Sequence, residues 1–98
     1  MGFKDIKRRV IECLRAGDIE FAVRRDVDLK NLLSTGDVSV PEVINVIMRA
    51  DGADHRMSPH HYDSSVDVHI ITVTCAGLHW YIKWYFDEPA SVFISVHH

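Results

Sequence analysis

The sequence predicts a single α+β domain over residues 1–98, with two main N-terminal helices packed on one face of a small antiparallel β-sheet. Apolar residues recur at helical spacing in the first half of the chain, whereas in the second half they alternate with polar residues. A chain of 98 residues is long enough for one hydrophobic core but not for two.

The first half holds the helix signals. Residues 3–16 carry apolar side chains at helical spacing and Gly17 follows as a C-terminal cap, which predicts an amphipathic helix. Residues 19–24 alternate and predict a short strand. Asp28 is expected to cap a brief helical turn, which Gly36 closes.

A second main helix is expected after residue 39. The segment Ser39-Val40-Pro41-Glu42 has the pattern of a capping box, with proline near the first helical position. The helix should end near Asp51-Gly52. Its expected buried stripe consists of Val40, Val43, Ile44, Ile47 and Met48.

The second half has a period of two. Segments 66–74, 78–86 and 91–96 are joined by short connections, which predicts an antiparallel meander, and a weaker strand is expected within 55–62. In segment 78–86 the even-numbered residues are apolar and should face the helices. The odd-numbered residues should then face the other way; they are His79, Tyr81, Lys83 and Tyr85.

The lengths of the two turns decide which residues of the neighbouring strands lie beside these odd-numbered residues. A three-residue turn at 75–77 places His69 opposite Lys83. A five-residue turn that pairs Phe86 with Val92 brings Ser95 beside Lys83 and His97 beside Tyr81. A four-residue turn reverses the face and leaves Ile94 and Val96 there, unless a bulge restores the parity.

The charge pattern narrows the function classes. With 11 Lys+Arg against 14 Asp+Glu, the net charge of −3 disfavours a generic basic nucleic-acid clamp but not a local basic site. All 7 histidines lie in the second half, so their protonation is expected to reverse the charge of that half between pH 7 and pH 5. We expect no membrane span and no signal peptide, and we expect Cys13 and Cys75 to be reduced and buried in a cytoplasmic protein.

The odd-numbered face of segment 78–86 has two interpretations. One is a solvated outer sheet face. The other is a phosphodiester site, in which Lys83 holds the phosphate while Tyr81 and a histidine exchange protons with the reacting oxygens. Such a site suits RNA cleavage by the neighbouring 2′-hydroxyl, which requires no metal or cofactor.

A metal site is the third alternative. His60-His61 with His69 or His79, and Asp63 or Asp67, offer metal-ligating groups. Adjacent histidines on a strand point to opposite faces, and the sequence has no HExxH or paired-cysteine motif. A cysteine nucleophile is also disfavoured, because neither thiol has an evident base.

Four short stretches resemble one family. Leu14-Arg15-Ala16-Gly17 is similar to its first helix ending "(L/V)xAG", and residues 43–47 to its second helix carrying "NVI". Trp80-Tyr81-Ile82-Lys83 is similar to its "VYLK" strand, and Phe93-Ile94-Ser95-Val96 to its "LIVSF" strand. The pattern, spread along nearly the whole chain, resembles the MqsR-like (motility quorum-sensing regulator) toxins, which are mRNA endonucleases with the RelE/ParE-like fold.

This resemblance implies the toxin component of a type II toxin–antitoxin system, an mRNA-cleaving enzyme neutralised by a cognate antitoxin protein. The family's active-site tyrosine falls on Tyr81, one lysine falls near Arg56 and another near His97. The family's middle-strand glutamine falls near Val68 or His69, so this sequence has no glutamine for that role.

The expected site follows from both lines of reasoning. Tyr81, His97 and His69 are the expected catalytic residues. The expected substrate-binding residues are Arg56, Lys83, His79 and Ser95. The alternative is a non-catalytic interaction domain that presents its helical face or a sheet edge to a partner protein. An antitoxin is expected to cover the site or to add a strand to a sheet edge, near residues 91–96 or Tyr62.

Overall fold

The computed structural model describes residues 2–22, 31–60 and 63–98. Its order confirms the α+β class: helices precede most of the strands. The elements are α1 (Phe3–Ala16), β1 (Ile19–Phe21), α2 (Leu32–Thr35), α3 (Val40–Arg49), η2 (Gly52–Asp54), β2 (His55–Pro59), β3 (Asp67–Cys75), β4 (Leu78–Asp87) and β5 (Ala90–His97). None of the described helices is long and apolar enough to cross a membrane.

The sheet is mixed rather than antiparallel. Its five strands lie in the order β1-β5-β4-β3-β2, and β1 runs parallel to β5 while the other pairs are antiparallel. Ile19 pairs with Ser91 and Phe21 with Phe93. The expectation that residues 91–96 form an edge is therefore wrong, because β1 covers that strand and the edges are β1 and β2.

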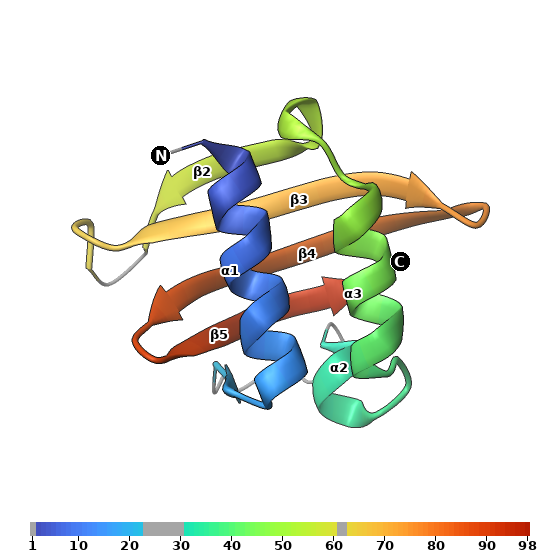
Figure 1. Ribbon diagram of the computed structural model, residues 1–98, viewed down its shortest axis with the longest axis horizontal. Helices are drawn as coiled ribbons and strands as arrows, with labels where there is room; N and C mark the ends of the chain where they lie inside the picture. Colours follow the sequence, from blue (N-terminus) through green and yellow to red (C-terminus); the bar gives the residue numbers. More distant parts are fainter. Residues whose placement is uncertain (1, 23–30, 61–62) are drawn as a thin grey trace.

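Helices α1 and α3 lie side by side over one face of the sheet (Figure 1). Gly17 ends α1 with φ +79°, the left-handed conformation that glycine adopts without strain. Ser39 and Glu42 form the predicted capping box at the start of α3. The Lys7 ammonium donates to the backbone oxygens of Met48 at 2.6 Å and Ala50 at 2.8 Å, which ties α1 to the C-terminal end of α3.

Two helix predictions need correction. The buried residues of α3 are Val43, Val46 and Ile47, whereas Met48 is 53% exposed. Because α3 packs against both α1 and β3, its buried arc is centred between these two neighbours. The cap of α2 is Asn31, whose side chain accepts from the Ser34 N–H; Asp28 lies outside the described residues.

One core joins the helices to the sheet. Val10, Val43 and Ile47 from the helices are fully buried against Ile71, Ile82, Trp84, Phe93 and Val96 from the strands. Burial of large apolar side chains contributes roughly 1.5–3 kcal/mol each, so this layer supplies most of the stability of the domain.

The β3–β4 hairpin turns on two residues. Cys75 pairs with Leu78, so the expected three-residue turn is wrong. Ala76 has φ +53° and Gly77 has φ +80°, the two positive values that a tight type I′ turn requires. In the part of the chain that the structure describes, Ala76 is the one non-glycine residue with positive φ.

Ala76 therefore offers a stabilising substitution. Asparagine tolerates positive φ better than alanine, and Asn-Gly is the favoured type I′ sequence, so Ala76→Asn should raise the free energy of unfolding by about 0.5–1 kcal/mol. Urea denaturation would measure the change. Ala53→Asn, at an exposed residue without positive φ, is the control and should not stabilise the protein.

Candidate functional site

Strand β4 places the predicted site on the sheet face that points away from α1 and α3. Trp80, Ile82 and Trp84 are buried in the core, as the alternation predicts. The intervening side chains lie on the opposite face, which we call the outer face; they are His79, Tyr81, Lys83 and Tyr85.

The turn between β4 and β5 has the register of the four-residue alternative, because Phe86 pairs with Ser91. The pairing continues to Asp87 and Ala90, so Glu88 and Pro89 alone form the turn, and the alternative that pairs Phe86 with Val92 is wrong. Continued without interruption, this register would place Ile94 and Val96 on the outer face.

A β-bulge changes the register and brings the predicted partners together. The pairing shifts between Lys83 and Trp84, after which Lys83 lies opposite Ser95 and Tyr81 opposite His97. With a turn of even length, the phosphodiester-site interpretation requires such a bulge. The bulge places Ser95 beside Lys83 and His97 beside Tyr81, as predicted.

The rings of Tyr81 and His97 stack on the outer face. Their ring centroids are 5.0 Å apart and the planes differ by 14°. Beside them lies a shallow hollow of about 410 Å³, lined in part by Thr72, His79 and Tyr81. The Nδ1 atom of His79 lies 2.9 Å from the hydroxyl oxygen of Thr74, and this contact fixes the orientation of the imidazole.

The two cations of the predicted site lie in one row across the sheet. Arg56 pairs with Ile70, Ile70 with Lys83, and Lys83 with Ser95. Because neighbouring strands are about 4.8 Å apart, the backbones of Arg56 and Lys83 are separated by about 10 Å. Both side chains flank Ile70 on the outer face, next to the row that holds Tyr81 and His97.

The outer face is not fully solvated, although the first interpretation of its residues expected a solvated face. Val68, Ile70 and Ile94 are buried there, and they form a small apolar cluster. Tyr81 and Tyr85 pack against this cluster. The tyrosines are thus held in place by apolar contacts.

His69 does not join this site. Because the β3–β4 turn has two residues, His69 lies opposite Trp84, not Lys83, and faces the helices. It is 5% exposed, and its Nδ1 lies 3.0 Å from Nε2 of His55. This histidine pair is the polar contact that sequence reasoning missed. The available signal was Gly77 alone, which suits the second central position of a two-residue turn; that turn moves every β3 residue to the other face.

Burial changes the acid–base behaviour of this pair. Desolvation, followed by the charges of His55 and Arg9, lowers the pKa of His69 from 6.5 to about 4, although Asp67 opposes the shift. Desolvation also lowers the pKa of His55. The predicted protonation of all 7 histidines between pH 7 and pH 5 is therefore wrong for His69.

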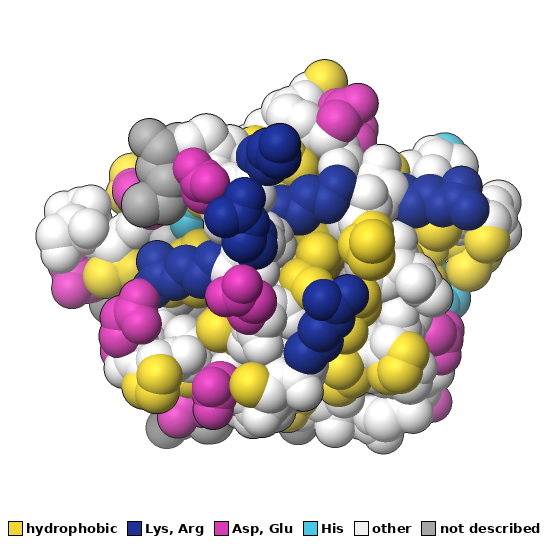
Figure 2. Space-filling view, in the orientation of Figure 1, with side chains coloured by type: hydrophobic (Ala, Val, Ile, Leu, Met, Phe, Trp, Pro, Cys, Tyr) yellow, Lys and Arg dark blue, Asp and Glu magenta, His cyan; other side chains and the backbone are white. Residues whose placement is uncertain are grey.

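Lysine and arginine side chains gather on the helical side of the molecule, opposite the outer face (Figure 2). Four cations and one acid of α1 line a hollow of about 350 Å³ together with Ile11 and Met48; they are Lys4, Lys7, Arg8, Arg15 and Glu12. A local basic surface therefore exists despite the net charge of −3, but it does not adjoin Tyr81 and Lys83.

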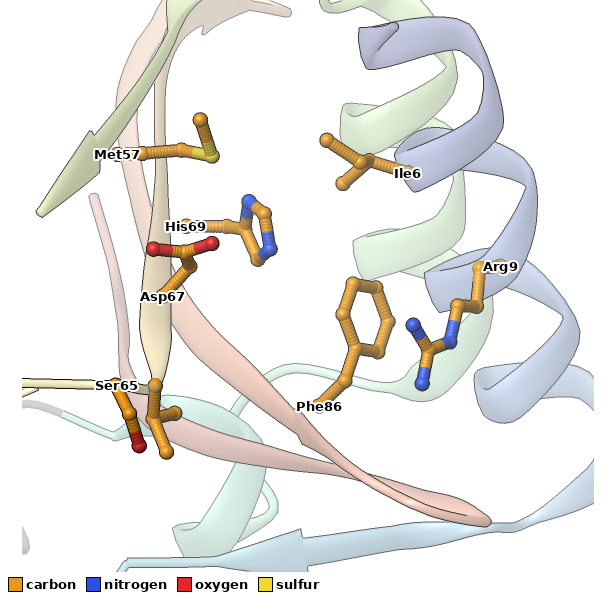
Figure 3. A pocket seen from close by; sticks show the side chains of 8 residues that line it. Ile6, Arg9, Met57, Ser65, Asp67, His69 and Phe86 are labelled. Atoms are coloured by element: carbon orange, nitrogen blue, oxygen red, sulfur yellow. The ribbon is translucent and has the colours of Figure 1, made fainter. Parts of the chain in front are cut away.

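A second hollow, of about 420 Å³, lies between α1 and the β2–β3 side of the sheet. Figure 3 shows His69, Asp67 and Met57 on strands β3 and β2, Phe86 on strand β4, and Ile6 and Arg9 on α1 opposite them. The guanidinium of Arg9 lies 4.0 Å from the Phe86 ring centroid and pairs with Glu88.

Among the described residues, the structure shows no cluster of side chains that supports the metal site or the cysteine nucleophile considered from the sequence. Within residues 2–22, 31–60 and 63–98, no three groups among histidine, cysteine, aspartate and glutamate converge on a metal position. His61 lies outside these residues, and His69 and His79 lie on opposite faces of the sheet. Cys13 is buried and Cys75 is half-buried, not fully buried as expected; both are free thiols.

No protein-family model matches the chain, and no curated protein matches it at a significant level.

The histidine pair predicts a specific pH dependence. Since the folded pKa of His69 lies below its unfolded value of 6.5, the unfolded state binds more protons as the pH falls. Stability should be fully present above pH 6.5 and decline towards pH 4, by about 2–3 kcal/mol in total. Urea midpoints measured across this range in the wild type and in His69→Met would test it. A slope that persists unchanged in His69→Met would contradict the assignment, and His79→Gln, which removes an exposed imidazole, should leave the slope unchanged.

Proposed function

We propose that this chain is a metal-independent endoribonuclease that cleaves mRNA, acting as the toxin of a type II toxin–antitoxin system. The proposal includes the finer identity of the fold, RelE/ParE-like with an MqsR-like active face, and a cytoplasmic location. It rests on the residues of the outer face together with the sequence resemblance at Tyr81, Lys83 and the surrounding strands.

The observation that carries the proposal is the stacked pair of Tyr81 and His97 beside the row of Lys83 and Ser95. A histidine imidazole can remove a proton from a 2′-hydroxyl, or return one to the leaving oxygen. The Tyr81 phenol orients or protonates the reacting phosphate. These roles need only positioned acid–base groups around the phosphodiester.

The remaining site residues serve binding. Lys83 and Arg56, about 10 Å apart across the sheet, offer positive charge to the scissile phosphate and to a neighbouring one. Ser95 is buried beside Lys83 and helps to fix that row, while His79 faces the adjoining hollow. His69 leaves the catalytic set because it faces the helices.

A cognate antitoxin is the proposed protein partner. Strand β2 is a sheet edge and contains Arg56 of the proposed site. A partner strand added there would lie next to the site and could block access of RNA to it.

The alternative function is a non-catalytic interaction domain. The basic hollow on α1, with its apolar floor at Ile11 and Met48, favours this alternative because it presents a surface for an acidic partner. The two functions differ in whether the outer face performs chemistry.

Catalysis can be tested on purified protein with single-stranded RNA. Tyr81→Phe with His97→Gln should reduce the cleavage rate at least 100-fold, because general acid–base groups contribute about 10²–10⁴-fold. The matched control is Tyr85→Phe, which removes the other tyrosine hydroxyl of the same strand face and should retain activity. Equal cleavage by the wild type and the double variant would reject the site.

A cellular test separates the enzyme from the interaction domain. Induction of the chain alone should arrest growth while total mRNA falls, and the double variant should do neither. Growth arrest without loss of mRNA, or arrest by the double variant as well, would favour the interaction domain. Growth counts and RNA quantification provide both readouts.

A further inference from the structure

The contact between His55 and His69 is directional. Their facing nitrogens are 3.0 Å apart, the ring centroids 5.2 Å apart, and the planes differ by 20°. This centroid separation is about the largest that two imidazoles sharing such a contact can have. The rings therefore meet edge to edge, nearly coplanar, with Nε2 of His55 and Nδ1 of His69 directed at each other. A proton occupies the space between them when both rings are neutral.

A third donor lies on the same side of the sheet. Met57 is the direct cross-strand partner of His69 and is two residues from His55, so all three side chains point to the helical face. Met57 is 57% exposed and lines the same hollow as His69, which leaves its thioether free to move towards the two nitrogens (Figure 3).

The surroundings of His69 match those of a metal ligand. Phe86 and Trp84 lie against its ring, with centroids at 5.3 and 5.4 Å, and so limit its rotation. The Asp67 carboxylate, two residues away on the same strand face, acts electrostatically on the imidazole. A carboxylate close to a ligating histidine raises its basicity. The hollow of about 420 Å³ provides an entry path.

We propose that His55, His69 and Met57 form a binding site for a soft monovalent metal ion, Cu(I), which takes the place of the hydrogen bond between the two imidazoles. The proton of that hydrogen bond moves, by exchange with solvent, to the other nitrogen of the same ring, so that both imidazoles ligate in their neutral form. Two imidazoles and a thioether are neutral donors that suit this ion, whereas hard divalent ions prefer carboxylates. Metal–nitrogen bonds of about 2.0 Å in a three-coordinate site place the nitrogens about 3.5 Å apart, so the rings need to separate by about half an ångström. The site lies on the opposite sheet face from Tyr81 and does not depend on the proposed nuclease activity.

The test is an anaerobic titration of the full chain with Cu(I) against a chromophoric Cu(I) chelator. One ion should bind per chain, and it should raise the melting temperature because only the folded state assembles the site. His55→Gln and Met57→Leu should each weaken binding about tenfold or more. Long-range ¹H–¹⁵N spectra of the histidines with redox-inert Ag(I) should shift Nε2 of His55 and Nδ1 of His69.

Controls separate this site from other donors. Met48→Leu removes the other strongly exposed methionine of the described residues, and His79→Gln removes an outer-face imidazole; neither should change the affinity. Cys75→Ala should also retain binding, since the thiol is not a proposed ligand. The proposal is overturned if no stoichiometric binding occurs. It is equally overturned if binding is lost in Cys75→Ala or is unchanged in both His55→Gln and Met57→Leu. Circular dichroism establishes that each variant is folded.

Discussion

The β-bulge opposite Lys83 and Trp84 is the constraint on which the two faces of the sheet depend. Before the bulge, Trp84 lies opposite Phe93 and both side chains are fully buried under the helices. Beyond it, Ile82 lies opposite Val96, and these two are buried as well. Because the side-chain period of a strand is two, one extra residue in β5 is needed for both pairs to face the core. The same extra residue places Ser95 and His97 on the outer face.

Much of this architecture could be predicted from local signals. Gly17, the capping box at Ser39 and the strict alternation of β4 each specify a local conformation, and α1, α3 and the inward face of β4 follow from them. The two-residue turn was harder to predict, because alanine at its first central position is not a typical residue for positive φ. That single turn decided whether His69 joined Tyr81 or His55. The parallel pairing of β1 with β5 is non-local, and a three-residue strand carries no signal for its partner.

The histidines divide into two chemical classes that the sequence does not distinguish. His69 is buried beside another imidazole and an arginine, so it stays neutral through most of the physiological pH range. His79 is exposed on the outer face, where it accompanies Tyr81 along β4 and lines the adjoining hollow. The neighbouring strands β3 and β4 thus hold imidazoles on opposite faces of the sheet. The sheet itself separates the two.

The position of β5 in the sheet has a consequence for biosynthesis. Residues 90–97 pair with β4 on one side and with β1 on the other, so the strand that closes the core is among the last synthesised of those described. While a nascent chain is still missing this strand, β1 has no partner and the helices have no Phe93 or Val96 to cover. Folding of the domain must therefore wait until residue 97 has left the ribosome, and a chain truncated before β5 would expose its apolar face to chaperones and proteases.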